Sequence, residues 1–320
     1  MEDAKTTAEP TLDAAMTSDE ALTFIREVLG VTSPKDKLAF DPVAFLNKML
    51  YSWQENIPYL TVLNIATPRK DRHRPTLLEV KNDIMAKFGG SCYHNNVGCY
   101  MVIKALGYQV TLVPADITST KSAHVLIIVF NLSGVGSKHL ADVGMGGWPT
   151  FQLIPLDFER ESPEYHESFL RYKFVRRDDL ILRQHNAESD PAGTKHFKAS
   201  LKDGWYTHSS IHYNMPVEVS HFDKIMEILH TQVIDDIPIL RKLWCIAFPK
   251  GRFLSINNTT LLEEQDNGWI KKTYLRSRDE IIGVFKRYFP QFDESTIHAA
   301  MEDEFIKLDF KRKEISKTSL

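Results

Sequence analysis

The hydrophobic positions near the N-terminus follow the spacing of amphipathic helices. Apolar residues recur every three or four positions between residues 18 and 30, and again between Asp41 and Trp53. Asp41 followed by Pro42 is a typical helix start, because Asp caps free N–H groups and proline fits the first turn. Residues 1–18 lack this pattern, and we expect them to form a disordered tail. The ordered chain therefore begins with helices.

A further helical pattern begins at Cys92, within the segment KFGGSCYHNNVGCYMVIKALG that ends at Gly107. Spacings of four and three place one set of residues on a single helix face: Cys92, Asn96, Cys99, Ile103 and Leu106. A helix N-terminus carries roughly half a positive charge, which stabilises a thiolate. Gly89 and Gly90 permit positive φ, or close approach of a substrate carbonyl to the main chain. Cys92 is therefore a candidate nucleophile, with a small core residue as the alternative interpretation.

The pattern changes to strands after Gly107. The runs AHVLIIVF (123–130) and HLADVG (139–144) read as buried strands. Strand-like pieces follow at 150–156, 169–175 and 196–213, separated by polar loops such as residues 184–193. Further helices are predicted at 220–231 and 277–288, with short strands between them. We therefore predict an α+β fold. Its predicted parts are a tail (1–18), a helical domain (19–107), a β domain (108–215) and an α/β domain (216–320).

Two polar side chains interrupt the buried strands. His124 opens the first run and Asp142 lies within the second, and a buried ring or carboxylate is costly without a partner. If each satisfies the other, the remaining ring nitrogen of His124 can face Cys92. Nucleophile, base and orienting acid would then form a catalytic triad. A core histidine bonded to the backbone explains the same strand equally well.

Composition narrows the class of protein. Lys and Arg number 39 against 42 Asp and Glu, which argues against a nucleic-acid groove or an anionic membrane surface. The longest strongly apolar run, Val125 to Phe130, is far shorter than the roughly 20 residues that span a bilayer. Three cysteines are too few for a disulfide framework, so we expect a cytoplasmic protein. His208, His212 and His221 lack the spacing of metal ligands, so we expect no metal.

The segment Phe88-Gly89-Gly90-Ser91-Cys92-Tyr93-His94-Asn95-Asn96 resembles the Arg-Gly-Gly-x-Cys-x-Glu-x-Asn motif of the arylamine N-acetyltransferases. The order of Cys92, His124 and then Asp142-Val143-Gly144 before a glycine-rich turn is also similar to that family. Phe88 and His94 replace the Arg and Glu of the motif. If those two positions changed as a unit, their side chains should touch, and the chain is a repacked, divergent member.

The resemblance implies the family's three-part fold: a helical domain, a β-barrel domain and an α/β lid around a papain-like Cys-His-Asp core. It implies acetyl-CoA as acyl donor, and an aromatic amine, arylhydroxylamine or hydrazine as acceptor, through acyl-Cys92. The turn carrying Gly144, Gly146 and Gly147 would contact CoA phosphate, unless it is a simple turn between strands. We expect no metal and a monomer. The basic cluster of Arg69, Lys70, Arg72 and Arg74 is expected to form a solvated loop, unless it meets the CoA phosphates. Two alternatives stay open: an amide-forming acyltransferase with another acyl donor, and a non-catalytic relative that acts as a binding module.

Overall fold

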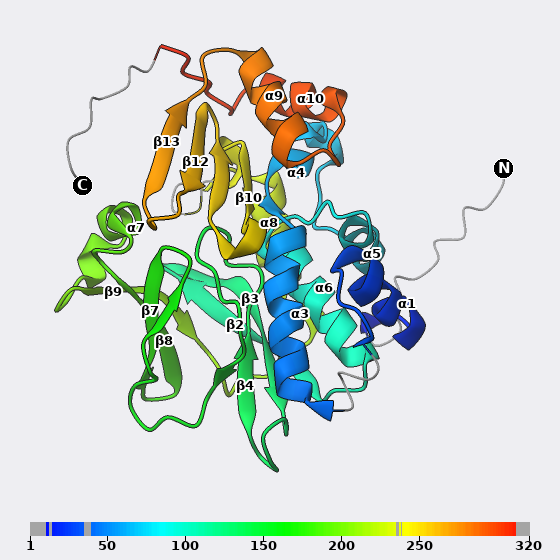
Figure 1. Ribbon diagram of the computed structural model, residues 1–320, viewed down its shortest axis with the longest axis vertical. Coiled ribbons are helices and arrows are strands. Elements are labelled where there is room, and N and C mark those ends of the chain that lie inside the picture. The colour runs from blue at the N-terminus through cyan, green and yellow to red at the C-terminus, as the bar shows by residue number, and fades with distance from the viewer. Residues whose placement is uncertain (1–10, 13–14, 35–39, 235–236, 238, 312–320) are drawn as a thin grey trace.

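The computed structural model describes residues 11–12, 15–34, 40–234, 237 and 239–311 (Figure 1). Most of the predicted tail lies outside these residues. Ala15 and Met16, which belong to the predicted tail, are instead buried in the first hydrophobic cluster, so the packed chain begins earlier than predicted. No helix in the described ranges has the length and apolar character needed to cross a membrane.

Helices dominate the first hundred residues. They are α1 (Ser18–Thr23), a π-helical turn (Phe24–Val28), α3 (Pro42–Asn56), α4 (Val62–Ala66), α5 (Leu77–Met85) and α6 (Cys92–Ala105). The start signals act as predicted: Asp41 accepts a hydrogen bond from the N–H of Ala44, and Pro42 occupies the first turn. The apolar faces of α3 and α6 meet in one core cluster, in which Trp53 is fully buried.

A curled eight-stranded sheet follows. Its strands are β2 (Val110–Ile117), β3 (Thr120–Phe130), β4 (Lys138–Ala141), β5 (Ile154–Pro155), β6 (Tyr165–Glu167), β7 (Leu170–Arg177), β8 (Leu180–Asn186) and β9 (Trp205–Ile211), in the order β5-β4-β3-β2-β9-β8-β7-β6. Strand β3 is apolar on both faces because it is buried on both. Val125 and Ile127 join the cluster that includes α6, whereas Leu126 and Ile128 join the interior of the curled sheet.

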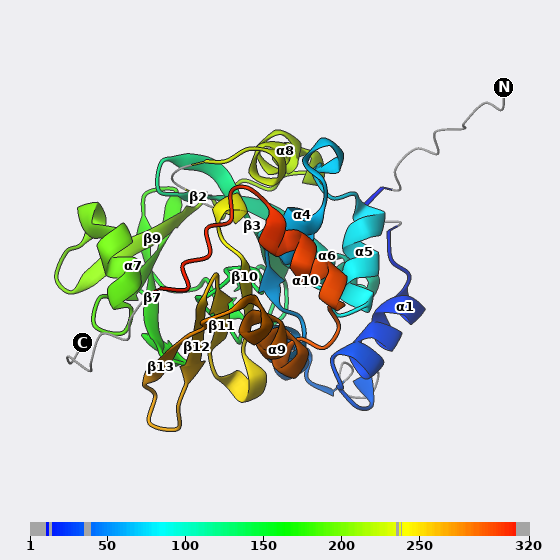
Figure 2. The same cartoon turned by 90° about the horizontal axis from the view of Figure 1, so that it is seen from above.

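The last third of the chain builds a second sheet with helices beside it. Strands β10 (Trp244–Ala247), β11 (Leu254–Asn257), β12 (Thr260–Glu264) and β13 (Ile270–Tyr274) pair in sequence order, and α9 (Arg278–Tyr288) and α10 (Glu294–Glu302) pack beside them (Figure 2). A short strand from the helical part of the chain, β1 (Tyr59–Leu60), pairs with β10 and forms one edge of this sheet. Helix α8 (Asp223–Thr231) precedes this sheet.

Two sequence predictions for the part of the chain around β8 and β9 of the eight-stranded sheet were wrong. Residues 184–193 are not one polar loop, because β8 runs to Asn186 and helix α7 (Pro191–His196) begins five residues later. The strand expected from residue 196 begins only at Trp205. The prediction failed at β8 because this strand buries polar side chains, Arg183 and His185, where a strand usually buries apolar ones.

Candidate active site

Cys92 is the first residue of α6, as predicted. Ser91 is its N-cap, and the ring of His94 accepts a hydrogen bond at Nδ1 from the Ser91 N–H (3.3 Å). A capping box usually has Glu or Gln in this third position, and here His94 fills it. Ser91 Oγ also lies 3.3 Å from Nε2 of His230 in α8, which ties that helix to the start of α6.

Both glycines before Cys92 adopt positive φ, +70° at Gly89 and +157° at Gly90. A Cβ at Gly89 would lie 2.1 Å from the carbonyl oxygen of Pro58, and one at Gly90 would lie 2.4 Å from Cγ of His94. The Leu60 N–H in turn donates to the Gly90 carbonyl (2.9 Å). The glycines thus let the loop pack against β1 and against its own helix cap.

His124 and Asp142 form the contact that the sequence predicts. His124 Nε2 lies 3.0 Å from Asp142 Oδ2, and the two side chains are 3% and 2% exposed. The β3–β4 register brings them together, because Ile127 pairs with Ala141 directly before Asp142. Cys92 Sγ lies 3.8 Å from the carbonyl oxygen of Ala123, and its thiol is a hydrogen-bond partner of the His124 ring. Asp142 occupies Nε2, which leaves Nδ1 available to the thiol.

His124 and Asp142 each stabilise the charged form of the other. Burial lowers the pKa of His124, but the charge and hydrogen bond of Asp142, together with Cys92, outweigh it and raise the pKa to about 10. Burial likewise raises the pKa of Asp142, yet His124, Arg183 and Asn96 bring it down to about 2. At neutral pH the ring is therefore an imidazolium beside a carboxylate, which is the state that pairs with a thiolate.

Asp142 is held by donors on both oxygens. Oδ1 accepts from Asn96 Nδ2 (2.8 Å) and from the Gly144 N–H (3.0 Å). Asn96 also donates to the Val125 carbonyl (2.7 Å) and accepts from the Val143 N–H (2.8 Å). The matching asparagine of the motif thus links α6 to β3 and to the segment after β4, and so fixes Asp142 relative to the helix that carries Cys92.

Gly144 lies so close to α6 that only glycine fits. A Cβ there would lie 2.8 Å from Asn96 Nδ2 and 3.0 Å from Cys92 Cα. We expect Gly144→Ala to destabilise the fold by about 1–3 kcal/mol, because the turn must move away from the helix. Urea unfolding measures this change.

The matched control for that substitution is Gly283→Ala. Gly283 lies in α9, where a new Cβ would meet nothing within 4 Å. Alanine should stabilise this helix by roughly 0.5–1 kcal/mol. Equal effects at both positions would contradict the close approach of Gly144 to Cys92.

The two departures from the motif have separate partners, contrary to the expectation that their side chains touch. Phe88 stacks on Phe292 with ring centroids 5.5 Å apart, in the cluster beneath the second sheet. His94 instead lies 3.4 Å from Asp83 through Nε2 and caps α6 through Nδ1. Each position is thus repacked on its own.

The basic stretch at residues 69–74 is largely exposed, as expected, with the exception of Arg72. Arg72 is buried, lies 2.6 Å from Asp303 through Nη2 and donates to the Ile65 carbonyl (2.7 Å). Arg69 pairs with Asp303 and Glu304. These contacts tie the end of α10 to the segment after α4. Arg74 pairs with Asp223 (3.2 Å), so all three arginines of the stretch have carboxylate partners.

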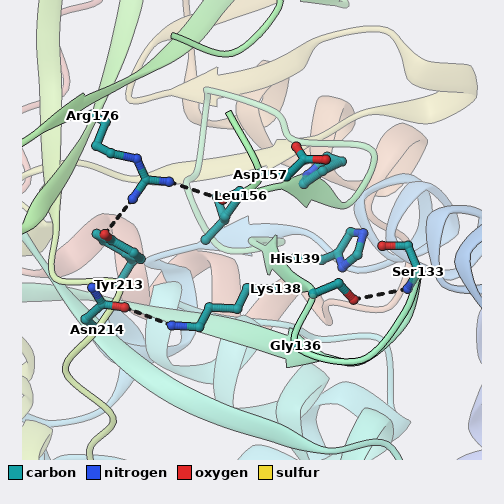
Figure 3. Close-up of a pocket in the computed structure, with 11 residues that line it drawn as sticks. Ser133, Gly136, Lys138, His139, Leu156, Asp157, Arg176, Tyr213 and Asn214 are labelled. Atoms are coloured by element: carbon teal, nitrogen blue, oxygen red, sulfur yellow. Dashed lines mark hydrogen bonds between the residues drawn. The ribbon is translucent and has the colours of Figure 1, made fainter. Parts of the chain in front are cut away.

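A pocket of about 380 Å³ lies at the other end of β4 from Asp142 (Figure 3). Its basic side chains have partners of their own: Lys138 donates to Asn214, and Arg176 donates to Tyr213 and to the carbonyl of Leu156. The pocket shares no residue with the Cys92 site and is separate from it. Among the described residues, no group of three or more His, Cys, Asp or Glu side chains is placed to hold a metal ion.

Sequence reasoning misses two buried side chains near the triad. Arg183 of β8 lies 3.6 Å from Asp142 Oδ2 through Nη1. His208 of β9 has no role that the sequence indicates. Its side chain is nevertheless 2% exposed, and the charges of His124 and Asp142 act on its pKa. The signal is present at Arg183, a charged residue directly after the apolar pair Ile181 and Leu182.

Solved structures of arylamine N-acetyltransferases have a similar fold. The Mycobacterium marinum enzyme in complex with CoA has a TM-score of 0.70 at 14% identity, and the match covers 89% of this chain and 100% of that one. For the Mycobacterium abscessus enzyme the TM-score is 0.69 at 14% identity, with 92% and 96% covered. For the Nocardia farcinica enzyme it is 0.68 at 17% identity, with 93% and 99% covered. At these identities the structural likeness establishes the fold.

The family follows from the sequence itself. Residues 43–291 match the family model described as N-acetyltransferase, which is more than half of the chain. No curated protein sequence matches the chain significantly. The chain belongs to the N-acetyltransferase family and has the arylamine N-acetyltransferase fold.

Proposed function

We propose that this protein transfers an acetyl group from acetyl-CoA to an aromatic amine, arylhydroxylamine or hydrazine, through acetyl-Cys92. The observation that carries the proposal is the buried His124–Asp142 pair (3.0 Å), with the Cys92 thiol against the same ring at a helix N-terminus. A nucleophile, a base and an orienting acid in that order are the parts that acyl transfer needs.

In the first half-reaction the Cys92 thiolate attacks the thioester carbonyl of acetyl-CoA, and the carbon–sulfur bond to CoA breaks. The departing CoA thiolate takes the proton of the His124 imidazolium. The products are acetyl-Cys92, neutral His124 and free CoA. Asp142 keeps the ring oriented, since its Oδ2 holds Nε2 while Nδ1 faces the reacting sulfur.

In the second half-reaction the acceptor nitrogen attacks the acetyl carbonyl of acetyl-Cys92. His124, now neutral, takes the proton that the nitrogen loses, and Cys92 leaves as thiolate. The amide or hydrazide departs, and the thiolate–imidazolium pair is restored. Thiol and base thus return to their starting states without an outside proton donor.

Gly144, Gly146 and Gly147 form the part of the site that we propose for CoA, with different roles. The Gly144 N–H already donates to Asp142, so this glycine provides close packing against α6. Gly146 has φ +64°, the conformation that lets successive N–H groups form an anion-binding nest with Gly147. The related Mycobacterium marinum enzyme has been solved in complex with CoA, which supports a CoA donor for this chain.

Aromatic rings border the same turn and support a flat, apolar acceptor. A Cβ at Gly146 would lie 3.5 Å from the Tyr59 ring, and one at Gly147 would lie 3.6 Å from the Phe253 ring. Met145, directly before Gly146, is buried. All three cysteines are free thiols, which is typical of proteins in the reducing cytosol, and we place the enzyme there. We propose that it is a monomer.

Mass spectrometry after incubation with acetyl-CoA tests the proposal. We expect one added acetyl group, mapped to the Cys92 peptide, and its loss when an aromatic amine is added. CoA binding without acetylation would support the binding-module alternative. Acetylation that only another acyl donor produces would support the alternative acyltransferase.

A further inference from the structure

Arg183, a buried arginine that the proposed reaction does not use, lies beside the triad. It is 1% exposed, and its Nη1 lies 3.6 Å from Asp142 Oδ2, the oxygen that also receives His124. A guanidinium in such a dry place is costly unless a partner and hydrogen bonds compensate it. We infer that Arg183 is a positioning residue, which holds Asp142 and the segment after the glycine-rich turn in line with Cys92. This inference rests on the proposed function.

Four contacts fix the orientation of the guanidinium. Nη1 donates to Thr150 Oγ1 (2.8 Å), and Nη2 donates to the carbonyls of Pro149 (2.8 Å) and Trp148 (3.2 Å). Its Cζ lies 4.7 Å from the centre of the Tyr172 ring. Residues 148–150 directly follow the turn that carries Gly146 and Gly147. One side chain on β8 therefore anchors both the triad carboxylate and the turn proposed for CoA.

Behind Arg183, a series of hydrogen bonds runs through His185 and Tyr206 to Asp190. Arg183 Nε donates to Nε2 of His185 (2.9 Å), so the proton of that neutral ring is on Nδ1, which donates to Tyr206 (3.1 Å). Tyr206 in turn donates to Asp190 (2.5 Å). Burial, then the nearby His208 and Arg183, hold the pKa of His185 well below its ordinary value. Since His185 is neutral, its ring does not repel the guanidinium of Arg183. The positive charge of Arg183 therefore faces the carboxylate of Asp142.

Other titratable side chains that face the triad stay neutral near pH 7. Burial, then the neighbouring Cys92, raise the pKa of Tyr59 in β1 well above its ordinary value. Burial, then Asp142, do the same for the pKa of Cys99 in α6. Burial, then Arg183, hold the pKa of His208 in β9 well below its ordinary value. Arg183 thus provides a fixed positive charge beside groups that carry none.

The test is Arg183→Gln, measured in two ways. We expect kcat for acetyl transfer to fall by about 10–100-fold, with KM for acetyl-CoA little changed, because misplacement of the acid by about 1 Å is enough for such a loss. The second measurement is the rate of Cys92 alkylation by iodoacetamide as a function of pH, followed by peptide mapping. A nearby cation favours loss of the proton that forms the thiolate–imidazolium pair. Without it, the acid limb should move to higher pH by about half a pH unit or more.

Two further variants separate charge from geometry. Arg183→Lys keeps the charge but cannot make the same fork of hydrogen bonds, so we expect a wild-type acid limb with a kcat lowered about tenfold. Arg176→Gln is the matched control: this half-buried arginine on β7 donates to Tyr213 and to a loop carbonyl at the other end of β4 (Figure 3). Its removal should leave both the acid limb and kcat unchanged.

Circular dichroism and thermal melts show which variants fold. If Arg183→Gln does not fold, Arg183→Lys still decides, because wild-type kcat in that variant would overturn the positioning role. An unshifted acid limb in folded Arg183→Gln, or the same shift in Arg176→Gln, would overturn the inference as well. Alkylation needs no acetyl-CoA. A wild-type protein that is never acetylated would therefore count against the proposed function, not against Arg183.

Discussion

Replacing Cys92 by serine should reduce acetyl transfer by at least about a thousandfold while leaving the fold almost as stable as before. The serine hydroxyl has nearly the same size, but it does not ionise near neutral pH and is a poor nucleophile without the pairing that a thiolate makes with imidazolium. Cys92 is 7% exposed and contacts the Ala123 carbonyl at 3.8 Å, where a hydroxyl can also donate. The free energy of unfolding should change by less than about 1 kcal/mol.

The measurement is the steady-state rate with acetyl-CoA and an aromatic amine, together with urea unfolding. Cys99→Ala is the matched control, because Cys99 lies on the same helix, is fully buried and faces the core. That change should cost stability through the lost packing but should leave Cys92 acetylation intact. Residual transfer above roughly one tenth of wild type in Cys92→Ser would count against Cys92 as the nucleophile.

Asp142→Asn should lower kcat/KM by about 10³–10⁴-fold. Every group around the carboxylate is a donor: Asn96 and the Gly144 N–H at Oδ1, and His124 at Oδ2. An amide must direct its NH₂ at one of them, so either the ring of His124 turns or the link to α6 breaks. The imidazolium also loses the charge that contributes to its raised pKa.

Asp116→Asn is the control for this effect. Asp116 is also buried, and its Oδ2 lies 3.1 Å from Nε2 of His212, a geometry much like that of the triad pair but on β2. We expect this substitution to weaken the fold and to leave catalysis unchanged. If Asp142→Asn kept more than a tenth of wild-type activity, or if the two variants lost equal activity, Asp142 would be a structural residue only.

The parts of the site that follow from local pattern were predictable from the sequence. Gly89, Gly90 and the helical spacing after Cys92 place the thiol at a helix start, and the continuous apolar run of β3 reflects burial on both faces. His124 and Asp142 were paired by a physical argument, since each interrupts a buried strand and needs a partner.

The parts that depend on long-range contacts were not predictable. Arg72 reads as a solvated loop residue because its partner Asp303 lies far along the chain. Residues 184–193 read as a loop because polar residues in a strand are normally exposed, whereas His185 is fully buried in a polar region beside Arg183. Helix α10 was missed because its short apolar face packs against α4, at the other end of the sequence.

The pairing of β1 with β10 has a consequence for how the protein is made. Tyr59 and Leu60 pair with Ile246 and Cys245, and the same short strand holds the carbonyl of Gly90, two residues before Cys92. At about 5–20 residues per second, a ribosome needs roughly 10–40 s to proceed from Leu60 to β10. During that time the loop before Cys92 is without the sheet that supports it. Cys92 is therefore among the first parts of the proposed site to be synthesised, and the loop before it is among the last to reach its final support.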